Sequence, residues 1–178
     1  SGRQLAARMA GVMPAGPRLP ALEAARAEGR PVLLLTGRFG NYEAARACLI
    51  ARGFDVGGLY RPMKNPFFNA HYVATMEAIG GPVFPQGRSG TKGLLTFLKS
   101  GGIAMLLNDL YVGSGVELPF LGRPARTSTS PAEIAARLGA ALIPVWGIRR
   151  ADGLDFDVEL DAPLPQGDIV ATTAAYNA

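Results

Sequence analysis

Cysteine and histidine each occur only once among the 178 residues of this sequence, as Cys48 and His71. A single cysteine excludes an internal disulfide and any metal site built from several cysteines. No other metal cluster is visible in the sequence, and we expect no cofactor. Alanine, leucine and isoleucine surround Cys48, and we therefore expect this residue to lie buried in a helix.

The sequence also lacks a long apolar run. No segment approaches the roughly 18 apolar residues that a membrane-spanning helix needs, and the first ten residues carry Arg3 and Arg8 but no apolar signal core. We therefore expect a chain that neither spans a membrane nor directs its own export, although it can lie on a membrane surface.

Charged residues are sparse, at 18% of the chain, and the formal net charge is +4. The basic residues are scattered, which argues against a nucleic-acid-binding stripe. A mild positive charge suits anionic lipid headgroups or an acidic carrier protein, and it equally suits ordinary solubility.

The hydrophobic residues, at 48%, occur in short runs that predict an alternation of strands and helices. The length suits one domain over residues 1–178, in which residues 1–20 are weakly patterned. The class is α/β with a mostly parallel sheet, and ligands in such sheets bind at the carboxyl ends of the strands. We expect strands at 31–36, 54–60, 82–84, 103–107 and 142–148, an edge strand at 156–160, and helices at 22–28, 42–52, 66–79, around 94–98 and from Ser130 to 138.

Two further segments carry specific expectations. Residues 111–129 read as a long irregular loop, and such loops in compact domains are often functional. The segment Thr36-Gly-Arg-Phe-Gly-Asn-Tyr-Glu43 places residue 38 at the end of a strand and Glu43 in the first turn of the next helix. On its own, this segment fits an ordinary strand-to-helix turn.

The same segment resembles the T-G-H-F-G-N-x-E signature of the bacterial lipid A biosynthesis acyltransferases, the lauroyl and myristoyl transferases. Four further segments resemble motifs of that family in the same order, so the resemblance runs from about residue 22 to about residue 165. They are Tyr60-Arg-Pro-Met-Lys-Asn-Pro66, Gln86-Gly-Arg-Ser-Gly90, Asp109 with Gly115-Val-Glu-Leu-Pro-Phe-Leu-Gly-Arg-Pro-Ala125, and Gly139-Ala-Ala-Leu-Ile-Pro144.

The resemblance implies a glycerolipid acyltransferase-type domain with a central, mostly parallel sheet flanked by helices. It implies transfer of a fatty acyl chain from acyl carrier protein or acyl-CoA to a hydroxyl of an anionic glycolipid or other lipid, at the cytoplasmic face of the bacterial inner membrane. The acceptor class stays open, because a related class acylates phosphatidylinositol mannosides.

The resemblance also implies the site. Arg38 stands at the position of the family's general base, and Glu43 at that of the acid that orients the base. The residues expected to bind substrate are Asn41, Arg61, Asn65, Arg88 and Asp109.

The sequence departs from the family in three places. Arg38 replaces histidine, and a guanidinium has no lone pair with which to accept a proton; we expect slow turnover and an ion pair between Arg38 and Glu43. Leu110 stands where the family often has glutamine. The family's N-terminal membrane helix and C-terminal basic segment have no counterpart here, so we expect an excised core that binds membranes peripherally.

Other interpretations stay open. Because Arg38 cannot act as a base, the chain can be a non-catalytic variant that binds lipid or acyl carrier protein. The run Gly87–Gly93 is similar to a phosphate loop of a nucleotide-binding domain but breaks the G-x-x-x-x-G-K-[ST] order. We expect His71 to be a half-buried helix residue and not a substitute base.

Overall fold

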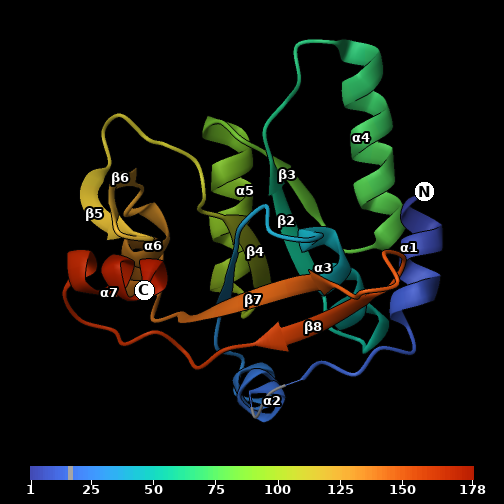
Figure 1. Ribbon diagram of the computed structural model, residues 1–178, viewed down its shortest axis with the longest axis horizontal. Coiled ribbons are helices and arrows are strands. Elements are labelled where there is room, and N and C mark those ends of the chain that lie inside the picture. The colour runs from blue at the N-terminus through green and yellow to red at the C-terminus, as the bar shows by residue number, and fades with distance from the viewer. Residues whose placement is uncertain (16–17) are drawn as a thin grey trace.

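The central sheet of the protein has six strands in the order β3-β2-β4-β1-β7-β8. The computed structural model describes residues 1–15 and 18–178 (Figure 1). All neighbouring strands pair in parallel except β7 and β8, so the mostly parallel sheet and the edge strand at 156–160 are confirmed. The strands are β1 (Val32–Thr36), β2 (Val56–Tyr60), β3 (Val83–Pro85), β4 (Ile103–Leu107), β7 (Ala141–Arg149) and β8 (Phe156–Leu160).

Helices connect and cover the strands, and local sequence signals set several of their starts. Asn41 and Asn65 cap two of them, because each side-chain oxygen accepts backbone N–H groups of the first turn. The helices are α1 (Gly2–Met9), α2 (Leu19–Ala27), α3 (Tyr42–Ala51), α4 (Pro66–Ile79), α5 (Arg88–Lys99), α6 (Ser130–Leu138) and α7 (Ile169–Asn177).

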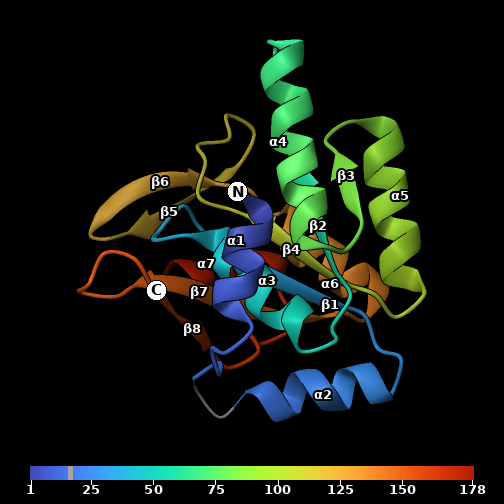
Figure 2. The same cartoon turned by 90° about the vertical axis from the view of Figure 1, so that its right-hand side faces the viewer.

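Both faces of the sheet are buried, which gives three layers. Along β1, Val32 and Leu34 face the layer that contains α1, α2 and α3, while Leu33 and Leu35 face α5 and α6. Figure 2 shows α1 lying against α3 on one side of the sheet. Alternate residues of one strand thus supply two cores, and this explains why the strand sequences are continuously apolar.

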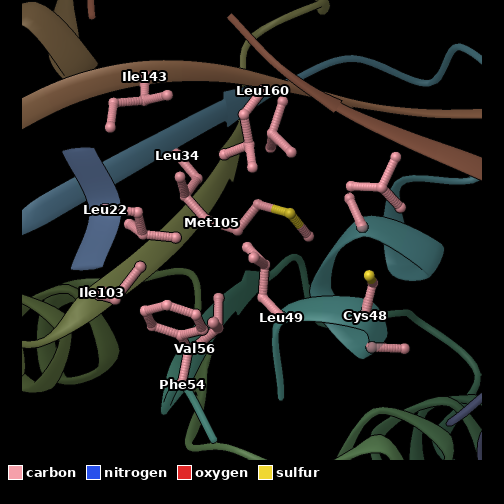
Figure 3. Packing of buried hydrophobic residues seen from close by; sticks show 14 of the residues in the cluster. Leu22, Leu34, Cys48, Leu49, Phe54, Val56, Ile103, Met105, Ile143 and Leu160 are labelled. Carbon is pink, nitrogen blue, oxygen red and sulfur yellow. The ribbon is translucent and has the colours of Figure 1, made fainter. Parts of the chain in front are cut away.

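Cys48 lies in α3 and is completely buried, as expected. Figure 3 shows its side chain in the core cluster with Leu49 of the same helix. The thiol donates a hydrogen bond to the carbonyl oxygen of Val12 at 3.1 Å, and burial raises the pKa of the thiol. The cysteine is therefore a packing residue.

The expectation of an irregular loop at 111–129 is wrong. The segment forms an antiparallel hairpin of β5 (Val116–Phe120) and β6 (Arg123–Thr127). Proline argues against a strand because it has no N–H for a ladder, but here Pro119 lies opposite Pro124 in a sheet of only two strands. Leu121 and Gly122 form the turn, with φ angles of 49° and 75°.

The sequence pattern predicts neither of the terminal helices. Residues 1–20 are weakly patterned, yet α1 occupies Gly2–Met9; Gly16 and Pro17 lie outside the described residues. Helix α7 is also unexpected, and its N-cap Asp168 accepts a hydrogen bond from the backbone of Ala171 at 2.7 Å. Helix α6 begins at Ser130, as expected, and its N-cap is Thr129, whose hydroxyl donates to the Glu133 carboxylate at 2.6 Å.

Within the described ranges, every helix is too short or too polar to cross a lipid bilayer.

Candidate active site

The carboxyl ends of β1 and β4 meet at the centre of the sheet edge, and this places Arg38 beside Asp109. The two strands pair in parallel with Thr36 aligned to Leu107, so Arg38 and Asp109 each lie two residues beyond the aligned pair. The Asp109 carboxylate accepts the Arg38 backbone N–H at 2.7 Å through Oδ2 and the Arg38 guanidinium at 2.6 Å through Oδ1. One carboxylate therefore fixes both the backbone and the side chain of Arg38.

This ion pair is partly exposed. The Arg38 side chain is 49% exposed and that of Asp109 is 28% exposed. Solvent screens such a pair, which contributes about 0–1 kcal/mol to stability. Its main effect is on orientation, because it turns the guanidinium toward β4.

Glu43 has a different partner, Arg46, one helical turn further along α3. The Arg46 Nε donates to Glu43 Oε2 at 3.0 Å, and the two side chains are 0% and 13% exposed respectively. Arg46 also donates to the carbonyl oxygens of Val56, Met76 and Gly80. The guanidinium thereby joins α3 to β2 and to the end of α4.

The expected ion pair between Arg38 and Glu43 is wrong, since the structure gives each residue another partner. Helical spacing presents Arg46 to Glu43 inside the protein, and burial makes that pairing obligatory because an unpaired buried charge is costly. Burial raises the pKa of the Glu43 carboxyl, and the Arg46 guanidinium opposes this shift. Arg38 turns instead to the carboxylate on the adjacent strand end.

Two tyrosines join α3 and α4 near these charges. The hydroxyl groups of Tyr42 and Tyr72 lie 3.1 Å apart. Burial and the contact with Tyr42 raise the pKa of Tyr72, and the Arg38 guanidinium opposes this shift. Tyr72 is therefore a neutral hydrogen-bonding group at physiological pH.

A cavity of about 750 Å³ opens beside Arg38. Its wall contains Leu59, Leu94, Leu95, Leu106 and Leu107, together with the polar side chains of Arg61 and Gln86. We call it the leucine cavity. Much of the remaining wall is polar and includes Ser128, Glu133 and Arg137. The cavity thus combines a leucine-lined side with cationic groups at the strand ends, an arrangement that suits an amphiphile with an anionic or carbonyl group at one end.

A model of the family described as bacterial lipid A biosynthesis acyltransferases matches residues 8–178. The chain belongs to this family. The match covers the two strand ends that carry Arg38 and Asp109, and it confirms the family resemblance and the fold class that the sequence motifs imply.

Individual relatives lie at low identity. A phosphatidylinositol mannoside acyltransferase of Mycobacterium tuberculosis is 28% identical over 158 residues, which cover 86% of this chain and 50% of the relative. A lipid A biosynthesis acyltransferase of Haemophilus influenzae is 23% identical over 149 residues, or 83% of this chain and 46% of the relative. The phosphatidylinositol mannoside acyltransferase of Mycolicibacterium smegmatis is 26% identical over 83% of this chain and 50% of its own length. The chain spans about half the length of the curated relatives it matches.

The structure brings together some of the residues that the family motifs single out, and separates others. Arg38 pairs with Asp109, and Arg38 and Arg61 both line the leucine cavity. Asn41 and Asn65 act as helix caps. Arg88 is exposed at the first position of α5, so its expected part in substrate binding stays a prediction.

The phosphate-loop interpretation loses its support, because residues 88–93 form the first turns of α5. Gly90 allows α5 to pack closely against the end of β3, because a Cβ atom at this position would lie 1.7 Å from the carbonyl oxygen of Pro85. His71 lies on α4 as expected, but it is exposed and not half-buried.

Sequence reasoning missed Arg46. A signal for it exists, because Arg46 is the one charged residue in the run from Ala44 to Ile50, three positions after Glu43. A lone charge in the apolar stretch of a helix, one turn from an acid, predicts a buried pair.

Double-mutant cycles on the free energy of unfolding test this pairing scheme. We expect Arg38→Ala and Asp109→Ala to couple by about 0.2–1 kcal/mol, as partly exposed pairs do.

Loss of either Glu43 or Arg46 should lower the free energy of unfolding by about 3–5 kcal/mol, because a buried charge remains. Arg38→Ala and Glu43→Ala, which share no partner, should add within about 0.5 kcal/mol; strong coupling between those two would contradict the scheme.

Proposed function

We propose that this chain is the core of an acyltransferase that moves a fatty acyl group from a thioester donor, acyl carrier protein or acyl-CoA, to a lipid hydroxyl. The observation that carries the proposal is the leucine cavity, whose lining combines leucine side chains with Arg38 and Arg61 at the carboxyl edge of the sheet. The cavity wall suits a fatty chain, and the forked donors of arginine suit a phosphate or a developing oxyanion.

The reaction needs a group that takes the proton from the acceptor hydroxyl. Arg38 stands at the position of the family's histidine, and its guanidinium has no lone pair to accept that proton. General base catalysis contributes about 10²–10⁴-fold to a rate. We therefore propose that this chain binds its substrates and turns them over slowly.

The acceptor that we propose first is the hydroxyl of an acyl chain on a glucosamine disaccharide, the acceptor class of the family's lipid A enzymes. Phosphatidylinositol mannoside, the acceptor class in the names of two of the relatives, is the second acceptor to assay. Both acceptors are anionic glycolipids, which the basic groups of Arg61 and Arg38 suit.

One observation favours a second function, namely binding of lipid or acyl carrier protein without transfer. Position 38 is engaged in an ion pair with Asp109 through two hydrogen bonds, so its side chain is already committed to a structural contact. The two functions differ in turnover, so an assay of acyl transfer separates them.

Replacing Arg38 by histidine should raise acyl transfer by about 10²-fold or more, because it restores a general base at the strand end. The assay follows a labelled acyl group from acyl carrier protein to each acceptor, in this chain and in a form lengthened to match its relatives. His71→Ala is the matched control and should leave residual transfer unchanged, since His71 is exposed on α4. Equal rates for the parent and Arg38→His would overturn the proposed role of position 38.

We also propose that the domain lies on the cytoplasmic face of the inner membrane, with the first turn of α4 against the lipid. Phe67 and Phe68 there are 87% and 56% exposed, and Arg61 and Lys64 precede them in the chain. Figure 1 shows this end of α4 projecting beyond the sheet. Exposed aromatic groups beside basic groups are typical of surfaces that bind anionic membranes.

Replacing Phe67 and Phe68 together by serine should lower binding to phosphatidylglycerol-containing vesicles by about tenfold or more, since each inserted phenyl group contributes about 1.5–3 kcal/mol. Co-sedimentation measures the bound fraction. The control is Leu154→Ser, because Leu154 is 61% exposed on the β7–β8 turn. Equal losses in both variants would reject α4 as the docking element.

A further inference from the structure

A second cavity, of about 580 Å³, lies on the other side of Arg38, against the β5–β6 hairpin and α7. Five aromatic side chains line it: Phe39, Tyr111, Phe120, Trp146 and Tyr176. We call it the aromatic cavity. Its volume falls within the range of about 300–1,000 Å³ that small-molecule sites occupy.

Contacts with the surrounding elements hold Trp146 and Tyr176 in place, whereas Phe39, Tyr111 and Phe120 are largely exposed. The rings of Trp146 and Tyr176 stack at a centroid distance of 6.1 Å and an interplanar angle of 13°. The indole Nε1 of Trp146 donates to Asp161 Oδ2 at 2.8 Å, so the polar atom of the ring is satisfied. Asn177 ties α7 to the hairpin through a 2.9 Å hydrogen bond to the Thr127 hydroxyl.

The polar groups of the aromatic cavity lie at two places. On the hairpin and α7 they are already paired, because Arg126 donates to the carbonyl oxygens of Gly113 and Gly115 and Asn177 to the Thr127 hydroxyl. The others lie where this cavity adjoins the leucine cavity. Arg38, Asn108, Leu110 and Tyr111 line both cavities, and Asp109 lines the aromatic one. The Arg38–Asp109 ion pair therefore stands at the junction of the two cavities. Burial raises the pKa of Tyr176, with the Asp109 carboxylate adding to the shift, so the phenol is neutral at physiological pH.

We propose that the aromatic cavity binds a second alkyl chain, one that carries a hydroxyl group at the Arg38–Asp109 pair. Flat aromatic walls bury methylene groups without leaving polar atoms unpaired. A hydroxyl is both donor and acceptor, so it can donate to the Asp109 carboxylate and accept from the Arg38 guanidinium. An alkyl carboxylate is a poorer fit, because its charge would face the Asp109 carboxylate.

This assignment rests on the proposed function only in naming the occupant as the acyl acceptor. The leucine cavity then holds the donor chain, the aromatic cavity holds the chain that bears the acceptor hydroxyl, and the two polar ends meet at position 38. Binding of a hydroxylated chain needs no turnover, so it is measured separately from acyl transfer.

Trp146 is the only tryptophan in the sequence, and its fluorescence therefore reports on the aromatic cavity directly. The probes are 1-dodecanol and dodecanoate, each titrated below the concentration at which it aggregates. We expect a saturable shift of the emission to shorter wavelength with dodecanol as the chain displaces water from the indole, and at least about tenfold weaker binding of dodecanoate. Absence of a saturable change, or equal affinities, would overturn the proposal.

Two substitutions locate the binding. Ala125 lines the aromatic cavity and Leu95 the leucine cavity, so Ala125→Phe should weaken the dodecanol response by about tenfold or more while Leu95→Phe leaves it unchanged. Phe120→Ser, at a side chain that is 48% exposed, is a second variant that perturbs the cavity from its solvent side and should also weaken the response. The assignment would be contradicted if Leu95→Phe weakened the dodecanol response as much as Ala125→Phe does. It would also be contradicted if Ala125→Phe and Phe120→Ser both bound dodecanol as well as the parent chain does.

The two measurements separate the two claims. A saturable dodecanol response in a chain that transfers no acyl group, even as Arg38→His, retains the aromatic cavity as a binding site and rejects the proposed function. Transfer by Arg38→His without any response of Trp146 retains the function and rejects this assignment.

Discussion

The parallel register of β1 and β4 is the constraint on which the site depends. It aligns Thr36 with Leu107, and the chain then leaves both strands at the same edge of the sheet, so Arg38 meets Asp109 two residues further on. The ion pair contributes little to stability because it is partly exposed. Its consequence is geometric: position 38 points toward β4, at the junction of the leucine and aromatic cavities.

The second constraint is the burial of Arg46. A guanidinium with no exposed surface must be paired and hydrogen-bonded, and Arg46 satisfies this requirement with Glu43 and with three carbonyl oxygens. Glu43 is thereby held on the buried side of α3 by its ion pair with Arg46. The two acidic groups near the strand ends thus have separate tasks, since Asp109 orients residue 38 and Glu43 neutralises a buried charge.

Much of the fold was predictable because its strands are continuous apolar runs closed by glycine and by capping residues. Asn41 and Asn65 mark two helix starts, and the run from Val32 to Thr36 marks the central strand. The hairpin was not predictable in the same way, because Pro119 and Pro124 argue against strands until it is known that they lie opposite each other in a two-stranded ribbon. The partners of Arg38 and Glu43 were mispredicted for a related reason. Sequence spacing indicates only that Arg38 and Glu43 belong to the same strand-to-helix turn. The order of the strands in the sheet places Asp109, 71 residues further along the chain, beside Arg38.

The central claim is that a guanidinium paired with Asp109 occupies the position of the general base. The most direct test is the pH dependence of kcat/KM for acyl transfer in the parent chain and in Arg38→His. A histidine base titrates near an unperturbed pKa of about 6.5, so the variant should gain activity as pH rises through that region while the parent shows no such inflection. The same inflection in both chains would contradict the claim, because the base would then lie at a residue other than position 38.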